Sequence, residues 1–165
     1  MGNSTAAVIY FSLDGNTRYL AQTIADAVGA TVIEIKPEAD QKGKGSLKHI
    51  WGSTQVTLPE EPAIAPIEDD LQSYDLLFLG TPVWAGGVAP PVRSFIRERE
   101  FFRRDFAVFA SYSGRTGRVF QDFRKRLVGN EILGEIGVRE PLEQQGQELE
   151  ERIHAWAREM QKLQR

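Results

Sequence analysis

The sequence contains no cysteine and only two histidines, His49 and His154. Without thiols the chain forms no disulfide, no thiolate-bound zinc or iron–sulfur site and no cysteine nucleophile. Two histidines also give little support to a histidine-built metal site. No stretch approaches the run of about 18 apolar residues that spans a bilayer. We therefore expect neither a disulfide scaffold, nor a metal centre, nor a membrane-spanning protein.

Neither sign of charge is in large excess, because the chain has 20 basic and 23 acidic residues and a net charge of −3. This balance predicts neither a nucleic-acid-binding protein nor an acidic tail. The stretch from Arg93 to Arg126 differs from the rest, with ten basic residues against four acidic ones. It is interpreted either as the solvated face of helices or as a docking patch for an acidic partner or ligand.

The first residues, Met1 to Ala6, carry no basic segment and no signal-peptide cleavage pattern before an apolar strand begins. We therefore expect a cytoplasmic protein. A length of 165 residues with 41% apolar residues is typical of one domain with a sizeable core, so residues 1–165 are predicted to form a single domain. No internal repeat divides the chain, and we expect a monomer.

Five short apolar runs rich in valine, isoleucine, leucine and phenylalanine predict strands that are buried on both faces. They are 6–11, 31–35, 75–79, 106–110 and 132–138. Helical patterns follow most of these runs, and their apolar stripes are Leu20, Ile24 and Val28; Val92, Phe95 and Ile96; Phe120, Phe123 and Leu127; and Leu149, Ile153, Trp156, Met160 and Leu163. Alternation of strands and helices predicts an α/β three-layer sandwich around a doubly wound, five-stranded parallel sheet of order 2-1-3-4-5.

The segment from Pro37 to Pro66 breaks this alternation. Four prolines and the run Lys42-Gly43-Lys44-Gly45 stand where a second helix would be expected. The composition predicts a long loop with at most one or two helical turns, and loops of this length in compact domains are usually functional or mobile.

Polar residues with one glycine follow the first strand and precede the first helix directly. Gly15 permits a close approach of the backbone, and Ser12, Asn16 and Thr17 supply side-chain donors. A helix N-terminus offers unpaired amides and partial positive charge, so this loop is predicted to bind a phosphate. It lacks the spacing of a nucleoside-triphosphate loop and of a dinucleotide fingerprint. The alternative is that Asp14 or Asn16 only caps the helix.

The third strand is followed by Gly80-Thr81-Pro82-Val83-Trp84-Ala85-Gly86-Gly87. A tryptophan just beyond a strand end, with glycines beside it, is suited to stack on a planar heterocycle. Gly86 and Gly87 would let main-chain amides face that ring. The alternative is that Trp84 packs on a neighbouring loop. Pro90 and Pro91 are predicted to begin the next helix.

The fourth strand ends in a second polar loop, from Ser111 to Gly117, in which Tyr112 offers another ring. An ordinary connection between strand and helix is the alternative here. In the predicted sheet order, ligands bind beyond the carboxyl ends of the strands where the order reverses. All three loops converge there, which favours one shared binding site.

With these motifs in view, the sequence resembles a short-chain flavodoxin over essentially its whole length. The segments Ser12-Leu13-Asp14-Gly15-Asn16-Thr17 and Gly80-Thr81-Pro82-Val83-Trp84, the latter followed by Ala89-Pro90-Pro91-Val92-Arg93, carry the resemblance. It implies FMN as cofactor, no catalytic amino acid and no metal. The residues that it implies for cofactor binding are Ser12, Asp14, Gly15, Asn16, Thr17, Thr81, Pro82, Val83, Trp84, Ala85, Gly86, Ser111, Tyr112, Ser113, Gly114 and Gly117.

Three features depart from the family pattern. Flavodoxins usually have threonine at the position of Asp14, and a carboxylate would repel a phosphate, so we expect its side chain to turn away or to cap the helix. The stacking tyrosine of flavodoxins usually lies in the loop after the fourth strand, and Tyr112 stands early in that loop. Flavodoxins are strongly acidic, whereas this chain has a basic middle, so its partners are expected to differ. Trp51 is interpreted either as part of a lid near the flavin or as a buried loop anchor.

The resemblance implies an electron-transfer protein that shuttles low-potential electrons between redox partner proteins. The alternative is a flavin-dependent NAD(P)H reductase acting on quinones or similar acceptors, in which Arg115 or Arg118 would bind the nucleotide phosphate. A flavin-free receiver domain fits poorly, because the first strand ends in Tyr10-Phe11-Ser12 rather than in an acidic cluster. We expect no nucleic-acid or membrane partner.

Overall fold

The computed structural model describes residues 5–38 and 61–164. Its parallel sheet contains β1 (Ala6–Tyr10), β2 (Thr31–Glu34), β3 (Leu76–Trp84), β5 (Asp105–Tyr112) and β6 (Glu131–Arg139). The order β2-β1-β3-β5-β6 confirms the predicted topology, and the short strand β4 (Gly87–Val88) pairs antiparallel with β3.

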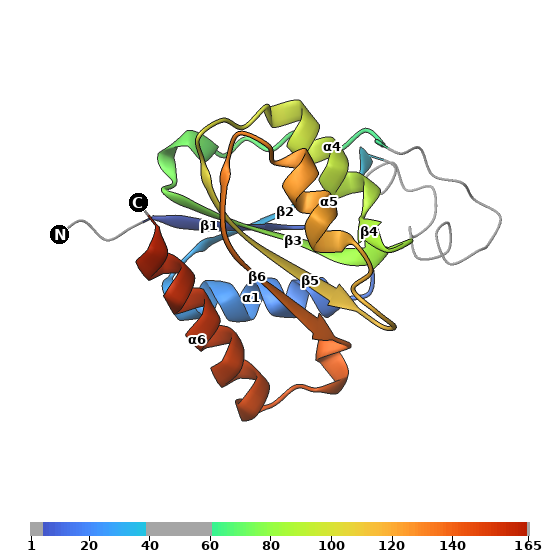
Figure 1. Ribbon diagram of the computed structural model, residues 1–165, viewed down its shortest axis with the longest axis vertical. Helices are drawn as coiled ribbons and strands as arrows, with labels where there is room; N and C mark the ends of the chain where they lie inside the picture. The colour runs from blue at the N-terminus through green and yellow to red at the C-terminus, as the bar shows by residue number, and fades with distance from the viewer. Residues whose placement is uncertain (1–4, 39–60, 165) are drawn as a thin grey trace.

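The sheet separates two layers of helices (Figure 1). One face carries α1 (Asn16–Val28) and α6 (Gln147–Leu163), and the other carries α4 (Pro90–Arg99) and α5 (Val119–Arg126). Single turns of 3₁₀-helix precede β3 at Leu71–Ser73 (η1) and follow β6 at Pro141–Glu143 (η2). As predicted, Pro90 is the first residue of α4.

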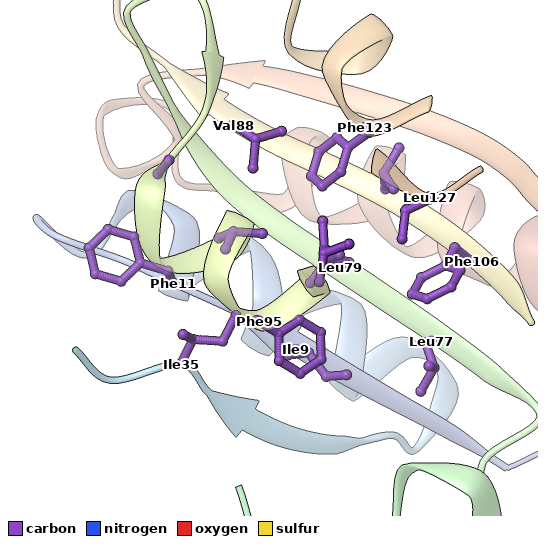
Figure 2. Close-up of a cluster of buried hydrophobic side chains, with 14 of the residues drawn as sticks. Ile9, Phe11, Ile35, Leu77, Leu79, Val88, Phe95, Phe106, Phe123 and Leu127 are labelled. Carbon is purple, nitrogen blue, oxygen red and sulfur yellow. The ribbon is translucent and has the colours of Figure 1, made fainter. Parts of the chain in front are cut away.

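Apolar residues alternate between two cores because successive side chains of a strand point to opposite faces. In β1, Ala7 and Ile9 face α4 and α5, whereas Ala6 and Val8 face α1 and α6. Figure 2 shows the first core, where Phe95 and Phe123 reach from their helices toward the strands. Both cores are dominated by fully buried aromatic and branched side chains, which explains why the strands read as continuous apolar runs.

Most of each predicted helical stripe is buried, and Leu163 is the exception because its side chain is 49% exposed near the end of α6. The first two predicted strands are each one residue too long, and the other three end too early, the third by five residues. The third strand continues through Trp84 and the fourth through Tyr112, so these two residues lie in strands rather than in loops. Both strands continue beyond the apolar runs that predicted them because β3 pairs with β5 as far as Pro82 and Ser111, and because Trp84 then pairs with Gly87 on β4 and Tyr112 with Arg139 on β6.

Only the ends of the predicted long loop belong to the described residues. Pro37 forms an antiparallel bridge with Ile64, and the Ala65 amide donates to the Lys36 carbonyl at 2.7 Å. The two ends of the loop therefore lie together beside β2. Most of the predicted loop, including Trp51, lies outside the described residues. In the part of the chain that the structure describes, no helix is both long and apolar enough to cross a membrane.

Tyr10 provides a test of how the sheet edge is stabilised at high pH. Burial raises the pKa of its phenol, although Arg18 donates a hydrogen bond to the hydroxyl at 3.3 Å. A raised pKa in the folded state means that the folded protein holds this proton more tightly, so its stabilising effect is lost as the pH rises above about 10. We expect Tyr10→Phe to lose less unfolding free energy than the wild type between pH 9 and pH 11, measured by urea unfolding. Equal losses of unfolding free energy in the two proteins would show that Tyr10 is not the source of this pH dependence.

Candidate functional site

Four segments meet at the carboxyl ends of β1, β3 and β5 and enclose a cavity of about 460 Å³. They are the loop between β1 and α1, the end of β3, the end of β5 and the turn η2. The residues that line the cavity are Asp14, Asn16, Pro82, Val83, Trp84, Ser111, Tyr112, Ser113, Glu140, Leu142 and Glu143. The volume lies within the range of about 300–1,000 Å³ that is usual for small-molecule sites. We call this the β1–β3–β5 cavity.

The loop before α1 is shaped by its own side chains. Gly15 has a φ of 99°, a left-handed conformation that favours glycine, and its amide donates to Ser12 Oγ at 3.1 Å. The Asp14 carboxylate accepts from the amide of Asn16, the first residue of α1, at 3.0 Å. Of the two expectations for Asp14, turning away or capping the helix, this contact resembles the second, although the N-cap residue itself is Gly15.

Two residues of the first turn of α1 connect it to other parts of the site. The Thr17 hydroxyl lies 2.7 Å from the Ser111 hydroxyl at the end of β5, and both side chains are buried. Asn16 Oδ1 accepts from the amide of Leu142 at 3.0 Å, which fixes η2 above the loop. The start of α1 is therefore held in place from β5 on one side and from η2 on the other.

The bond between Thr17 and Ser111 leads to a first prediction for the site. Thr17→Ala would leave the buried Ser111 hydroxyl without this partner, so we expect a loss of about 1–2 kcal/mol in unfolding free energy. Loss of the anchor of the first turn should also reduce the preference for FMN over riboflavin, measured as the ratio of their Kd values. Thr17→Ser keeps the hydroxyl and should retain both properties. An unchanged ratio of the two Kd values in Thr17→Ala would show that Thr17 does not contribute to phosphate binding.

Trp84 also lines the β1–β3–β5 cavity. It lies at the end of β3, and its ring meets that of Phe11 edge-on, with centroids 5.6 Å apart and an interplanar angle of 88°. Beyond Trp84 the chain reverses in a two-residue turn, with φ values of 49° at Ala85 and 74° at Gly86, and Trp84 pairs with Gly87. Two positive φ values in a two-residue hairpin are characteristic of a type I′ turn.

This hairpin is fastened to the start of α5. The Gly86 carbonyl accepts from the Arg118 amide at 2.7 Å, and the Asp122 carboxylate accepts from the Val88 amide at 2.9 Å. A Cβ on Gly117 would lie 2.7 Å from the Gly86 Cα atom, so only glycine permits this approach. On the inner side, the Thr81 hydroxyl accepts from the Ala89 amide at 2.9 Å. The position of Trp84 therefore depends on α5 as well as on the sheet.

Asp122 is the side chain by which α5 holds the hairpin. It also accepts a hydrogen bond from Arg126 of the same helix at 2.8 Å. We expect Asp122→Ala to lower the unfolding free energy by about 1–2 kcal/mol, because it leaves the partly buried Val88 amide without its acceptor. Exchange of the Val88 amide hydrogen should become faster, as measured by NMR. Gln121→Ala, on the exposed side of the same helix, is the matched control. Unaltered exchange at Val88 would show that the hairpin is held by other contacts.

The structure divides the predicted site residues into four groups. Those that line the β1–β3–β5 cavity are Asp14, Asn16, Pro82, Val83, Trp84, Ser111, Tyr112 and Ser113. Those that support it from within the loop or the protein interior are Ser12, Gly15, Thr17 and Thr81. Ala85, Gly86 and Gly117 line a separate cavity on the other side of the hairpin, and Gly114 lines neither of these two cavities. The binding role of each residue stays a prediction.

Three lining residues were missed by the sequence reasoning: Glu140, Leu142 and Glu143. They follow β6 directly, so the rule that selected the other loops, a polar segment at the carboxyl end of a parallel strand, would also have selected them. Glu140 has a φ of 41°, and its amide donates to the Tyr112 carbonyl at 2.8 Å, which attaches this segment to the end of β5. With Asp14, the two glutamates place three carboxylates around the cavity.

Comparison with known proteins agrees with this architecture. A flavodoxin family model matches residues 5–133, which is well over half of the chain. The chain therefore belongs to the flavodoxin family, as the sequence resemblance predicted. No curated protein matches the chain.

Several solved structures share the fold. A flavoprotein from Lactobacillus acidophilus in complex with FMN is 22% identical, with a TM-score of 0.64 over 85% of this chain and 95% of that one. A flavoprotein from Bacteroides uniformis is 20% identical, with a TM-score of 0.70 over 95% of this chain and 99% of that one. A flavodoxin from the domain Archaea is 16% identical, with a TM-score of 0.61 and coverage of 96% of each chain. These likenesses confirm the flavodoxin-like fold.

Proposed function

We propose that this member of the flavodoxin family binds FMN in the β1–β3–β5 cavity and carries electrons between redox partner proteins. The observation that supports the proposal most directly is that the N-terminal end of α1 and the indole ring of Trp84 line the same cavity. FMN combines a phosphate with a planar tricyclic ring, so it needs both features. The FMN complex of the Lactobacillus acidophilus flavoprotein, which has the same fold, supports this choice of cofactor.

The phosphate end fits a dianion through main-chain groups. The amides of Thr17 and Arg18 belong to the first turn of α1, where helix amides have no carbonyl partner within the helix. Gly15 has no side chain of its own to shield the loop, and the Leu142 side chain borders it, since an added Cβ at Gly15 would lie 3.4 Å from Leu142 Cδ1. The Asp14 carboxylate is engaged with the Asn16 amide. The loop can therefore hold a phosphate by its backbone, with Asn16 and Ser12 beside it.

The ring end fits a flat apolar group. Trp84 and Tyr112 lie on neighbouring strands and border the same cavity, which Pro82 and Val83 also line. Flavin supplies the redox chemistry when it is bound. Around it, the side chains of Trp84 and Tyr112 would exclude water from the ring. Asp14, Glu140 and Glu143 would make added negative charge in the cavity unfavourable, which lowers the potential at which it can be added.

Anaerobic stepwise reduction of the FMN-loaded protein tests the carrier function against the alternative, an NAD(P)H reductase acting on quinones. A carrier should take up electrons in two well-separated one-electron steps and should not oxidise NADH or NADPH unaided. A single two-electron step together with steady NAD(P)H oxidation would support the reductase instead. Failure of the protein to bind FMN would contradict both functions.

A further inference from the structure

A groove runs between α4 and α5, which lie side by side on the face of the sheet opposite α1 and α6 (Figure 1). It consists of two cavities of about 570 Å³ and about 480 Å³ that share Arg93. Figure 2 shows Phe95 and Phe123 pointing from these helices inward to the sheet. Of the core residues, Ile96 and Leu127 also border the larger cavity, among charged side chains of the two helices. We call this surface the α4–α5 groove.

The groove is predominantly basic. Five cationic side chains line it, Arg93, Arg97, Arg118, Lys125 and Arg126, against two carboxylates, Glu100 and Asp122. All five belong to the segment from Arg93 to Arg126, in which basic residues outnumber acidic ones. The fold therefore gathers five of the ten basic residues of that segment along one hollow surface.

One of the two carboxylates is already committed to the structure. Asp122 accepts from Arg126 at 2.8 Å and from the Val88 amide at 2.9 Å. Arg97 pairs with Glu61, yet its side chain remains 74% exposed. Lys125 and Arg118 are exposed as well. Enough cationic charge thus faces solvent to attract an acidic ligand.

Apolar side chains lie at one end of the groove. Phe102 is 67% exposed and Val128 is 79% exposed, and both border the larger cavity. The Arg103 guanidinium lies over the Phe102 ring, 5.3 Å from its centroid. Exposed apolar groups with a charged rim are typical of protein interaction sites. A ligand for this end should therefore offer an apolar side chain in addition to negative charge.

The other end of the groove reaches the proposed cofactor site. Ala85, Gly86 and Gly87 line the smaller cavity, and Trp84, the residue before them, lines the β1–β3–β5 cavity. A chain bound in the groove would therefore touch the hairpin that separates the two. An electron carrier needs its partner to approach the cofactor, and this end of the groove provides such an approach.

We propose that the α4–α5 groove docks an acidic segment of a redox partner protein, with carboxylates along Arg97, Arg118 and Lys125 and one aliphatic or aromatic side chain against Phe102 and Val128. This proposal rests on the proposed electron-carrier function, because it names the chemistry of that carrier's partner. The apolar end favours a protein segment over a nucleic acid, because a peptide can offer an aliphatic or aromatic side chain to Phe102 and Val128.

A synthetic acidic peptide tests the proposal. The probe is a decamer of glutamate and aspartate with one central leucine, titrated into the ¹⁵N-labelled, FMN-loaded full-length protein at low and high salt. We expect saturable shifts at α4, α5 and residues 85–87, weakened by salt because the attraction is electrostatic. The double variant Arg97→Gln, Lys125→Gln should raise the Kd about fivefold or more. Phe102→Ser should weaken the leucine peptide but not a peptide with serine in its place.

The matched control is the double variant Arg158→Gln, Lys162→Gln, which removes the same charge from exposed positions of α6 on the other face. Equal weakening by this control would show non-specific charge attraction and overturn the proposal. Tighter binding of a single-stranded oligonucleotide of equal charge would also overturn it. Self-association through Phe102 and Val128, with the association itself measured by sedimentation, would overturn it as well. The flavin spectrum of each sample separates the two proposals, because loss of FMN contradicts the proposed function while unchanged FMN without peptide binding contradicts only the docking site.

Discussion

Gly80→Ala is expected to destabilise the protein by about 3 kcal/mol, the largest effect that we predict for a single methyl group. Gly80 on β3 pairs with Phe109 on β5, and both residues are completely or almost completely buried. A Cβ on Gly80 would lie 2.1 Å from two ring atoms of Phe109. Since Gly80 also pairs with Tyr10 on β1, the strand is held on both sides and cannot move away from the ring. Urea unfolding measures the loss.

Two variants make this prediction specific. Gly114→Ala is the matched control, because nothing lies within 4 Å of its added Cβ, and it should change the unfolding free energy by less than about 0.5 kcal/mol. Phe109→Leu in the Gly80→Ala background should recover part of the loss, because the shorter side chain vacates the contested space. Strictly additive effects of the two substitutions would show that the ring of Phe109 is not what excludes a side chain at Gly80.

Trp84→Ala is expected to weaken FMN binding by about 1–3 kcal/mol, or about five- to 150-fold in Kd. The indole borders the β1–β3–β5 cavity, and its edge-on contact with Phe11 fixes its orientation. Its removal would take away the flat apolar surface against which the flavin ring is proposed to lie and would admit water in its place. Titration of the apoprotein with FMN, followed by quenching of flavin fluorescence, gives the Kd.

Trp84→Phe should keep most of the affinity, because it retains an aromatic ring on the same strand. Trp156→Phe is the second control, since Trp156 packs against Phe78 in the other core, away from the cavity. Thermal unfolding of the apoproteins separates loss of contact from loss of fold. If Trp84→Ala binds FMN as tightly as the wild type, Trp84 has no part in the site.

The centre of the sheet could be predicted from the sequence because β1, β3 and β5 are buried on both faces, whereas the edge strands β2 and β6 are only partly buried. Ala6–Tyr10 and the central part of β5 form continuous apolar runs, and parallel strands joined by helices have few alternative orders. The carboxyl ends of β1, β3 and β5 then had to meet. The convergence of Asp14, Trp84 and Tyr112 on one cavity follows from this order.

Local features that depend on tertiary contact could not be predicted in this way. Strand β4 has only two residues, too few for any pattern, and it forms because Asp122 on α5 accepts from the Val88 amide. Ala85 adopts a positive φ that its own side chain does not favour. The fold placed Ala85 and Gly117 on the far side of the hairpin because β3 continues through Trp84 before it turns.

The basic segment illustrates the same difference between composition and arrangement. The count of charges between Arg93 and Arg126 was visible in the sequence, but its two interpretations could not be separated there. Arg104, for example, donates to the Leu71 and Tyr74 carbonyls and leaves the exposed surface, whereas Arg97 stays largely exposed beside the groove. Which cations face solvent was decided by the packing of α4 and α5.

The most direct test of the central claim is a titration of the ¹⁵N-labelled protein with FMN, with contacts between flavin ring protons and the Trp84 indole detected by NMR. If FMN occupies the β1–β3–β5 cavity, amide signals of residues 12–18, Trp84 and residues 111–113 should shift together, and the indole should show direct contacts with the ring. Shifts confined to another surface, or no binding at all, would contradict the proposed cofactor site.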